Sequence, residues 1–139
     1  MSINNLSRRK WIQYSGIALL SFLIQKKVVA SHPTEIEYIS PKQAYERLNS
    51  SKLVDVRSSE EYKSQHIEGS ISIPLSTNEF VASFQKQFPF NTHLIIVCQT
   101  GMRSSKAAQQ LIQSGYSHVS VIRGGLNEWN RQGLFLTSS

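Results

Sequence analysis

The residue of this chain best suited to covalent chemistry is its single cysteine, Cys98. It directly follows residues 94–97, an unbroken apolar run of the kind expected for a parallel strand covered by helices on both faces. The residues after it are Gln99, Thr100, Gly101, Met102, Arg103 and Ser104. An amphipathic stretch with apolar residues at helical spacing comes next. The pattern therefore predicts that Cys98 lies at a tight turn from a strand into a helix.

A turn of this kind would activate a thiol. Successive backbone N–H groups in a tight loop point inward, and the following helix adds the positive end of its dipole. Both features lower the pKa of a thiol at the start of the loop, so we expect Cys98 to be nucleophilic at neutral pH. Gly101 can take a positive φ in the loop, and Arg103 adds positive charge. The alternative is a small buried thiol that ends an apolar strand.

Other polar residues near the predicted strand ends favour structural roles. Asp55 follows a buried strand and is interpreted as an acceptor of backbone N–H bonds rather than a catalytic acid, because buried carboxylates must be satisfied. Arg57 is also expected to be structural. Arg103 either faces the substrate or pairs with a carboxylate such as Glu61 to hold the loop.

No metal site or disulfide is expected. A single cysteine excludes an intramolecular disulfide and a cysteine-rich zinc framework. His66 lies in a predicted turn, without a neighbouring acid or histidine that would indicate a cysteine-protease arrangement. The remaining histidines show no ligand spacing: His32, His93 and His118.

The elements that must position Cys98 alternate between strands and helices. Strands are expected at 53–56, 71–73, 94–97 and 119–122. Helices are expected over about 41–49 and 104–114, in a short segment after residue 58, after residue 76, and from 126 to a stop at 133. Capping boxes predict three of these helix starts, at Ser40, Ser58 and Ser76. The pattern predicts an α/β fold, an open, mostly parallel sheet with helices on both faces and its ligand site beyond the carboxyl ends of the strands.

Some side chains are assigned to the buried face of these helices by their spacing. In the first helix they are Ala44, Tyr45 and Leu48. In the helix after residue 76 they are Phe80, Phe84 and Phe88, spaced four apart. Trp129 is also expected in the core.

Composition fits one compact domain without a nucleic-acid surface. The chain has 139 residues, 40% of them hydrophobic. Lys plus Arg is 15 against 9 for Asp plus Glu, but five of the basic residues and none of the acids lie in residues 1–30. The near-neutral remainder lacks the charge excess that a nucleic-acid groove needs.

Residues 1–30 are expected to be a signal peptide cleaved after Ala30. An uncharged run over 11–25 lies between basic groups and is too short to cross about 30 Å of hydrocarbon. Arg8 and Arg9, followed by bulky apolar residues, resemble a twin-arginine signal. We expect export of the domain at 31–139 to the periplasm or an equivalent compartment, with no stable membrane insertion after cleavage. A core helix or an uncleaved membrane anchor is the alternative.

From about residue 36 to 134 the chain resembles the rhodanese family of single-domain sulfurtransferases. The loop at 98–104 looks like the family's active loop. Three other motifs follow the family's order, at 55–57, at 66–71 with 73–74, and at 124–126 with Trp129. The resemblance implies the rhodanese-like fold.

The resemblance also implies a chemistry. Cys98 would carry a persulfide, ringed by the residues of the substrate-binding loop, Gln99, Thr100, Gly101, Met102, Arg103 and Ser104. The partners would be a small sulfur-donor anion, such as thiosulfate, or a persulfide, and a thiol, protein or cyanide acceptor. No metal or organic cofactor is required, and a monomer is expected. Gln99 and Thr100 depart from the tandem-domain, thiosulfate-using members, which carry a basic residue there, so the physiological donor stays open.

Two other functions stay open from the sequence. Cysteine phosphatases of related fold share a loop that begins with Cys and ends with Arg, but with one residue more than the four between Cys98 and Arg103. The smaller ring favours a sulfur atom over a tetrahedral oxyanion. A non-catalytic binding module is the other alternative. Inactive rhodanese-like proteins tend to have lost the cysteine or the loop glycine, and this chain keeps Cys98 and Gly101.

Overall fold

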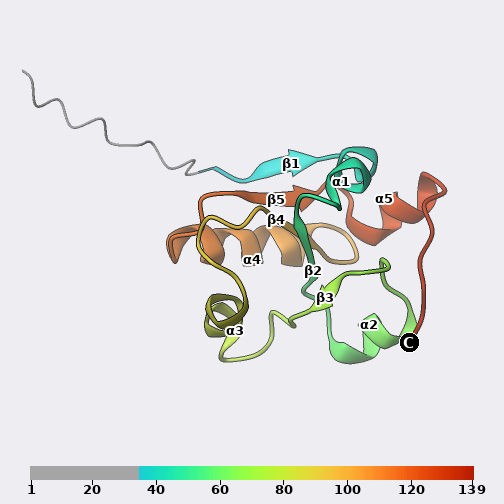
Figure 1. Cartoon of the computed structure of the whole chain (residues 1–139). Coiled ribbons are helices and arrows are strands. Elements are labelled where there is room, and N and C mark those ends of the chain that lie inside the picture. Colours follow the sequence, from blue (N-terminus) through green and yellow to red (C-terminus); the bar gives the residue numbers. More distant parts are fainter. Residues whose placement is uncertain (1–34) are drawn as a thin grey trace, which may run out of the picture. The chain divides into compact units, whose positions relative to one another are not determined.

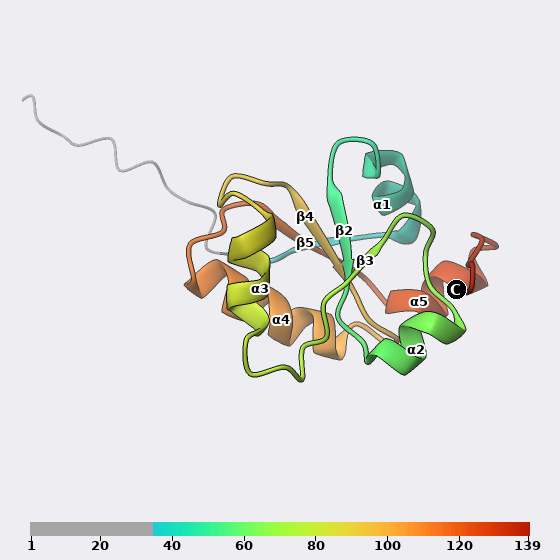
Figure 2. The same ribbon diagram turned by 60° about the horizontal axis from the view of Figure 1, so that its bottom comes forward.

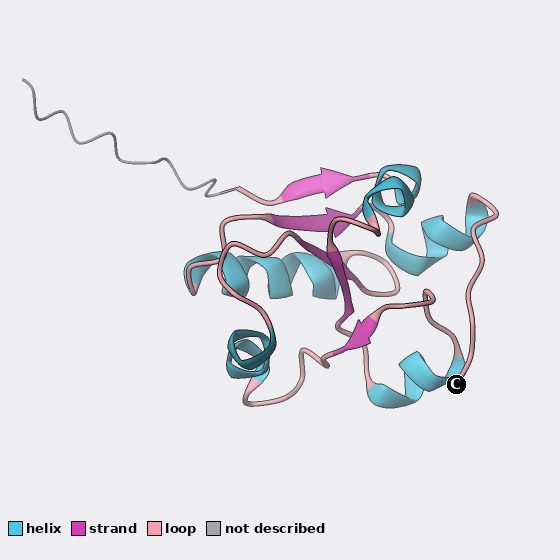
Figure 3. Ribbon diagram, in the orientation of Figure 1, coloured by secondary structure: helices cyan, strands magenta, loops and turns pink. Residues whose placement is uncertain are grey.

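The computed structural model describes residues 35–139, and the predicted export segment lies outside them. Strands and helices alternate along the described part, as Figures 1 and 3 show. The strands are β1 (Glu37–Ile39), β2 (Lys52–Asp55), β3 (Ile71–Ser72), β4 (Leu94–Val97) and β5 (Val119–Ile122). The helices are α1 (Pro41–Arg47), α2 (Ser59–Ser64), α3 (Phe80–Gln87), α4 (Met102–Gln113) and α5 (Gly125–Arg131).

The strands form one parallel sheet in the order β1-β5-β4-β2-β3. All four residues of β4 are buried, and β4 pairs with β2 on one side and β5 on the other. The predicted open α/β sheet with a central strand at 94–97 is therefore confirmed. Since all strands run the same way, their carboxyl ends meet at one edge, where Cys98 follows β4.

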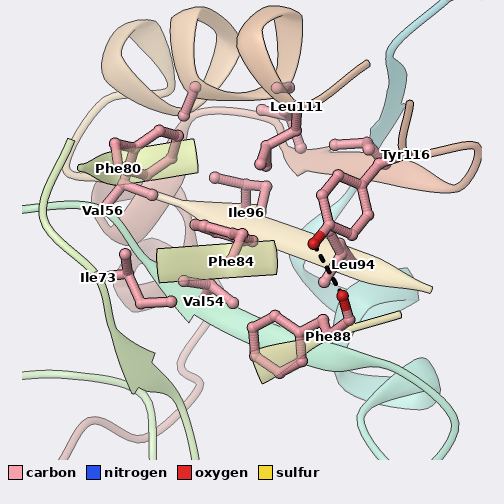
Figure 4. Packing of buried hydrophobic residues seen from close by; sticks show 14 of the residues in the cluster. Val54, Val56, Ile73, Phe80, Phe84, Phe88, Leu94, Ile96, Leu111 and Tyr116 are labelled. Carbon is pink, nitrogen blue, oxygen red and sulfur yellow. Dashed lines mark hydrogen bonds between the residues drawn. The ribbon is translucent and has the colours of Figure 1, made fainter. Parts of the chain in front are cut away.

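Helices cover both faces of the sheet, as Figure 2 shows. On one face α3 and α4 pack against alternate strand residues, and Phe84 of α3 lies in one cluster with Val54 and Ile96 (Figure 4). The Tyr116 hydroxyl donates to the Phe88 carbonyl oxygen at 2.9 Å, so its buried polar atom is satisfied. The predicted phenylalanine stripe is confirmed, and each such side chain stabilises the fold by about 2 kcal/mol on burial.

The opposite face is covered by α1 and α5. Ala44 of α1 and Trp129 of α5 lie in a second cluster with Ile95 and Ile122 of the central strands. The indole N–H of Trp129 donates to the Phe135 carbonyl oxygen at 3.1 Å. Helix α5 thus rests on the sheet directly behind the loop that follows Cys98.

Two of the three predicted capping boxes form. The Ser40 and Ser58 side chains accept from the backbone N–H three residues on, and both reciprocal bonds are present. The box at Ser76 was wrong: α3 begins only at Phe80, and its N-cap makes no side-chain hydrogen bond. The Thr77 hydroxyl instead donates to the Pro74 carbonyl oxygen at 3.0 Å, which closes a turn where a helix was predicted.

Three further local predictions need correction. The Tyr45 side chain was assigned to the buried face of α1, yet it is 58% exposed. Helix α4 begins at Met102, earlier than predicted, so the end of the cysteine loop belongs to the helix. Strand β1 was not predicted, because two of its three residues are exposed and the segment lacks an apolar signal.

Candidate active site

Cys98 lies at the carboxyl end of the central strand, and its side chain is fully buried. The loop behind it curls around the sulfur. The backbone N–H of Gly101 donates to Cys98 Sγ at 3.1 Å, and the backbone N–H of Ser104 donates at 3.4 Å. The Ser104 hydroxyl oxygen also lies 3.4 Å from Sγ. The predicted inward-facing loop is therefore present around the thiol.

These donors favour the thiolate. Burial alone raises the pKa of the Cys98 thiol, because a charged sulfur is costly away from water. Hydrogen bonds from the Ser104 side chain and from the backbone amides of Ser104, Gly101 and Thr100 outweigh burial, so the pKa of Cys98 lies below its ordinary value. The predicted lowering of the thiol pKa agrees with this arrangement.

Gly101 joins the loop to helix α4. Its φ of +101° is in the left-handed region, which residues other than glycine rarely adopt, and its backbone N–H donates to the sulfur. Its carbonyl oxygen accepts from the backbone N–H of Ser105 at 3.0 Å and from the hydroxyls of Ser104 and Ser105 at 3.1 and 2.8 Å. These bonds fix the helix start that places Ser104 beside Cys98.

The start of α5 supports the loop from behind. The backbone N–H groups of Leu126 and Asn127 donate to the carbonyl oxygens of Cys98 and Gln99 at 2.9 and 3.1 Å. This contact requires glycine at 125, because a Cβ there would overlap the Cys98 carbonyl oxygen and lie 2.7 Å from the Gln99 carbonyl carbon. Gly125 is thus part of the site's framework.

Both polar atoms of the Gln99 side-chain amide are hydrogen-bonded. Its amide nitrogen donates to Asn127 Oδ1 at 2.6 Å, and its amide oxygen accepts from Arg57 at 3.2 Å. Arg57 forms a buried ion pair with Asp55 at 2.8 Å, and Asp55 also accepts from the Arg57 backbone N–H. The structural interpretation of Asp55 and Arg57 agrees with these contacts.

Arg103 pairs with Glu61, as in one of the two alternatives left open by the sequence. Two guanidinium nitrogens of Arg103 donate to the two carboxylate oxygens at 2.8 and 2.9 Å. The hydrogen bonds from Arg103 lower the pKa of the Glu61 carboxyl to about 2, and the same bonds raise the pKa of Arg103. Glu61 also accepts from the Ser58 backbone N–H in the capping box of α2, so the pair connects the cysteine loop to that helix.

Comparison with known proteins identifies the fold. A family model described as a rhodanese-like domain matches residues 40–132. The chain belongs to the rhodanese-like domain family.

Solved structures of this family share its fold with the chain. The rhodanese-like domain of an Anabaena protein is 21% identical, with a TM-score of 0.68 over 76% of this chain and 81% of that one. A rhodanese-like domain protein from Staphylococcus aureus is 26% identical, with a TM-score of 0.63 over 75% and 99%. A thiosulfate sulfurtransferase from Pseudomonas aeruginosa is 22% identical, with a TM-score of 0.64 over 74% of this chain and 20% of that one.

None of the three histidines among residues 35–139 forms a hydrogen bond with Cys98. The His66 ring stacks on Tyr62 with centroids 3.9 Å apart, and its Nδ1 contacts the Tyr62 carbonyl oxygen at 2.7 Å. His93 and His118 stack on each other just before β4 and β5, at the opposite edge of the sheet. Among residues 35–139, no three His, Cys, Asp or Glu side chains group as a metal site, and no helix is long and apolar enough to span a membrane.

Sequence reasoning missed two residues beside the loop. Tyr38 in β1 and Arg123 after β5 line a cavity together with Thr100, Gly101 and Met102. Tyr38 belongs to β1, which has no apolar pattern that predicts a strand. Arg123 directly precedes Gly124 and Gly125, and nothing in the sequence distinguishes it from other exposed basic residues. The order of β1 next to β5 brings both of them to the edge where Cys98 lies.

Proposed function

We propose that this rhodanese-like protein is a sulfurtransferase that moves sulfane sulfur through a persulfide on Cys98. The observation that carries the proposal is the set of N–H and O–H donors around Sγ, from Gly101 and Ser104. A resting thiolate and a persulfide are both anions, and hydrogen-bond donors fixed around the sulfur stabilise both.

The reaction would take place in two displacements. The Cys98 thiolate attacks the outer sulfur of a donor such as thiosulfate, a new S–S bond forms, and the donor's S–S bond breaks as sulfite leaves with the electron pair. An acceptor thiolate or cyanide then attacks the outer sulfur of the persulfide. The bond to Cys98 breaks, and the Cys98 thiolate leaves. A lowered pKa favours Cys98 as that leaving group, because thiols of lower pKa leave faster.

The side chains of the loop bear on the choice of donor. Arg57 is hydrogen-bonded to the loop through Gln99, and Arg103 is part of the loop. Each of these two guanidinium groups is paired with a carboxylate. Gln99 is held by Arg57 and Asn127. The sulfonate group of thiosulfate would thus meet no unpaired arginine within the loop at 98–104, which favours a persulfide donor over thiosulfate.

The same contacts argue against a phosphatase. In that chemistry the arginine that ends the loop must be available to the phosphate oxygens. Both terminal nitrogens of the Arg103 guanidinium, Nη1 and Nη2, are bound to Glu61.

The intact mass of the protein tests the proposal. Incubation with thiosulfate or with a small persulfide should add the mass of one sulfur atom, and cyanide should remove it and yield thiocyanate. Cys98→Ser is the control, since it removes the only thiol with little change in volume. The sulfurtransferase assignment would be abandoned if the unchanged protein gained no sulfur from either donor, or if Cys98→Ser gained it equally.

A further inference from the structure

A cavity of about 420 Å³ lies directly beside the cysteine loop. Its size is in the range of small-molecule sites, about 300–1,000 Å³. The residues that line it and bear on its chemistry are Tyr38, Thr100, Gly101, Met102, Ile122 and Arg123. They come from β1, from the loop and start of α4, and from the end of β5.

Gly101 both lines this cavity and contacts the reactive sulfur. Its backbone N–H donates to Cys98 Sγ at 3.1 Å. A Cβ at position 101 would lie 3.6 Å from the backbone N of Gly124 and 3.8 Å from the carbonyl oxygen of Ile122, and both of these residues line the cavity. A ligand in the cavity therefore sits one glycine away from the sulfur.

The walls of the cavity are apolar and held in place. Met102 is 80% exposed and Tyr38 is 46% exposed, so both offer apolar surface to a ligand in the cavity. The Tyr38 hydroxyl donates to Ser105 Oγ at 3.2 Å, and Ser105 Oγ donates in turn to the Gly101 carbonyl oxygen. The Tyr38 ring is thereby anchored to the start of α4.

Arg123 gives the cavity a positive charge. Among the described residues that line the cavity it is the one with a charge, and its guanidinium donates to the Tyr38 carbonyl oxygen at 3.3 Å. Within the described part of the chain no carboxylate pairs with Arg123, whereas Arg57 and Arg103 each have one. The cavity thus combines apolar walls with a cation whose other donors are available to a ligand.

We propose that this cavity binds the body of the sulfur acceptor, and that the acceptor is a low-molecular-weight thiol that carries a carboxylate. The inference rests on the proposed sulfurtransferase function. The carboxylate binds the Arg123 guanidinium, the carbon chain packs on Met102 and Tyr38, and the thiolate reaches the outer sulfur of the Cys98 persulfide past Gly101. A compact inorganic donor lacks the carbon chain that would use the apolar walls.

The test compares two acceptors of one shape, 3-mercaptopropionate and its neutral amide. The protein is first converted to the persulfide, and the loss of the sulfur is followed in single turnovers with each thiol. For each variant we take the ratio of the rate with 3-mercaptopropionate to the rate with the amide, because a change in the reactivity of the persulfide affects both rates equally. For the unchanged protein we expect the carboxylate to be favoured, and for Arg123→Gln we expect that ratio to fall about tenfold, as for loss of one charge-assisted bond.

Two further variants sharpen the result. Arg123→Lys keeps a cation and should retain most of the preference for the carboxylate. Lys86→Gln removes an exposed cation on α3 that does not line the cavity and lies 4.0 Å from Glu79, and it should leave the ratio of the unchanged protein intact. Thermal unfolding checks that all variants fold.

The outcomes separate the two proposals. If the persulfide forms and reacts with cyanide, but Arg123→Gln keeps the ratio of the unchanged protein, the acceptor inference is wrong and the sulfurtransferase function stands. The same holds if a reduced protein thiol reacts faster than 3-mercaptopropionate in a manner independent of Arg123. If no persulfide forms, both proposals are overturned.

Discussion

The Ser104 hydroxyl offers a direct test of how the loop activates its thiol. Ser104 is fully buried in the first turn of α4, with Oγ 3.4 Å from Cys98 Sγ and 3.1 Å from the Gly101 carbonyl oxygen. A hydroxyl has one proton, so it donates to the thiolate only when it releases that carbonyl. Ser104→Ala removes this donor and keeps the Ser104 backbone N–H beside the sulfur.

The size of the effect follows from one charge-assisted hydrogen bond. Such bonds contribute about 1.5–3 kcal/mol, and a contact of 3.4 Å to sulfur belongs at the lower end. About 1.5 kcal/mol corresponds to about one pKa unit. We therefore expect Ser104→Ala to raise the pKa of Cys98 by about one unit. The Gly101 carbonyl oxygen keeps two donors from Ser105, so the substitution leaves no unsatisfied acceptor.

Ultraviolet absorbance of the thiolate against pH measures this shift, and the signal belongs to Cys98 because the chain has no other cysteine. Ser105→Ala is the matched control, since its hydroxyl also donates to the Gly101 carbonyl oxygen but has no contact with Sγ. It should leave the thiol pKa unchanged. A Ser104→Ala midpoint that stays within a few tenths of a unit of the unchanged protein, or moves down, would refute the role of the hydroxyl.

Two more predictions concern the framework of the loop. Gly125→Ala should destabilise the domain by about 2–3 kcal/mol in denaturant unfolding and slow persulfide formation, because the new Cβ overlaps the Cys98 carbonyl oxygen. Gly133→Ala is its control, with a positive φ of +75° but open space around the Cβ, and should cost only about 1 kcal/mol; equal losses for both glycines would contradict the close-approach argument. Glu61→Gln should cost less than about 1 kcal/mol near neutral pH, because the Arg103 and Glu61 side chains stay 42% and 37% exposed. The pKa of Glu61 is lowered to about 2 from 4.5, so this stabilisation is present above about pH 4.5 and lost as the pH falls toward 2. A stability difference between the two proteins that does not shrink across that range would argue against the ion pair as its source.

Local sequence patterns were sufficient to predict the central strand β4 and the turn that follows Cys98. The apolar run of β4 and the amphipathic pattern of α4 depend on residues close together in the chain, and both predict their elements with an error only at the start of α4. The capping boxes at Ser40 and Ser58 are also local. The box at Ser76 failed because Thr77 found a competing partner, the Pro74 carbonyl oxygen, in a turn.

The long-range parts of the site were beyond sequence reasoning. Arg103 and Glu61 are 42 positions apart, and sequence alone left the partner of Arg103 undecided. The docking of α5 on the Cys98 and Gln99 carbonyl groups requires knowledge of the three-dimensional approach that Gly125 permits. The edge strand β1 has too little apolar pattern to be found, and with it the cavity wall at Tyr38 was missed. The export signal at 1–30 stays a prediction.

Because backbone amides are among the donors that stabilise the Cys98 thiolate, the reactivity of the thiol and its preference for an acceptor can be changed separately. Gly101 and Thr100 contribute to the lowered pKa of Cys98 through their backbone amides, and the Met102 side chain is largely in solvent. Substitutions at Thr100 and Met102 that preserve the backbone path therefore leave reactivity in place while they reshape the surface that a substrate meets. A library restricted to these two positions could change acceptor preference with the nucleophile kept constant, which makes the loop a suitable starting point for sulfurtransferases of altered selectivity.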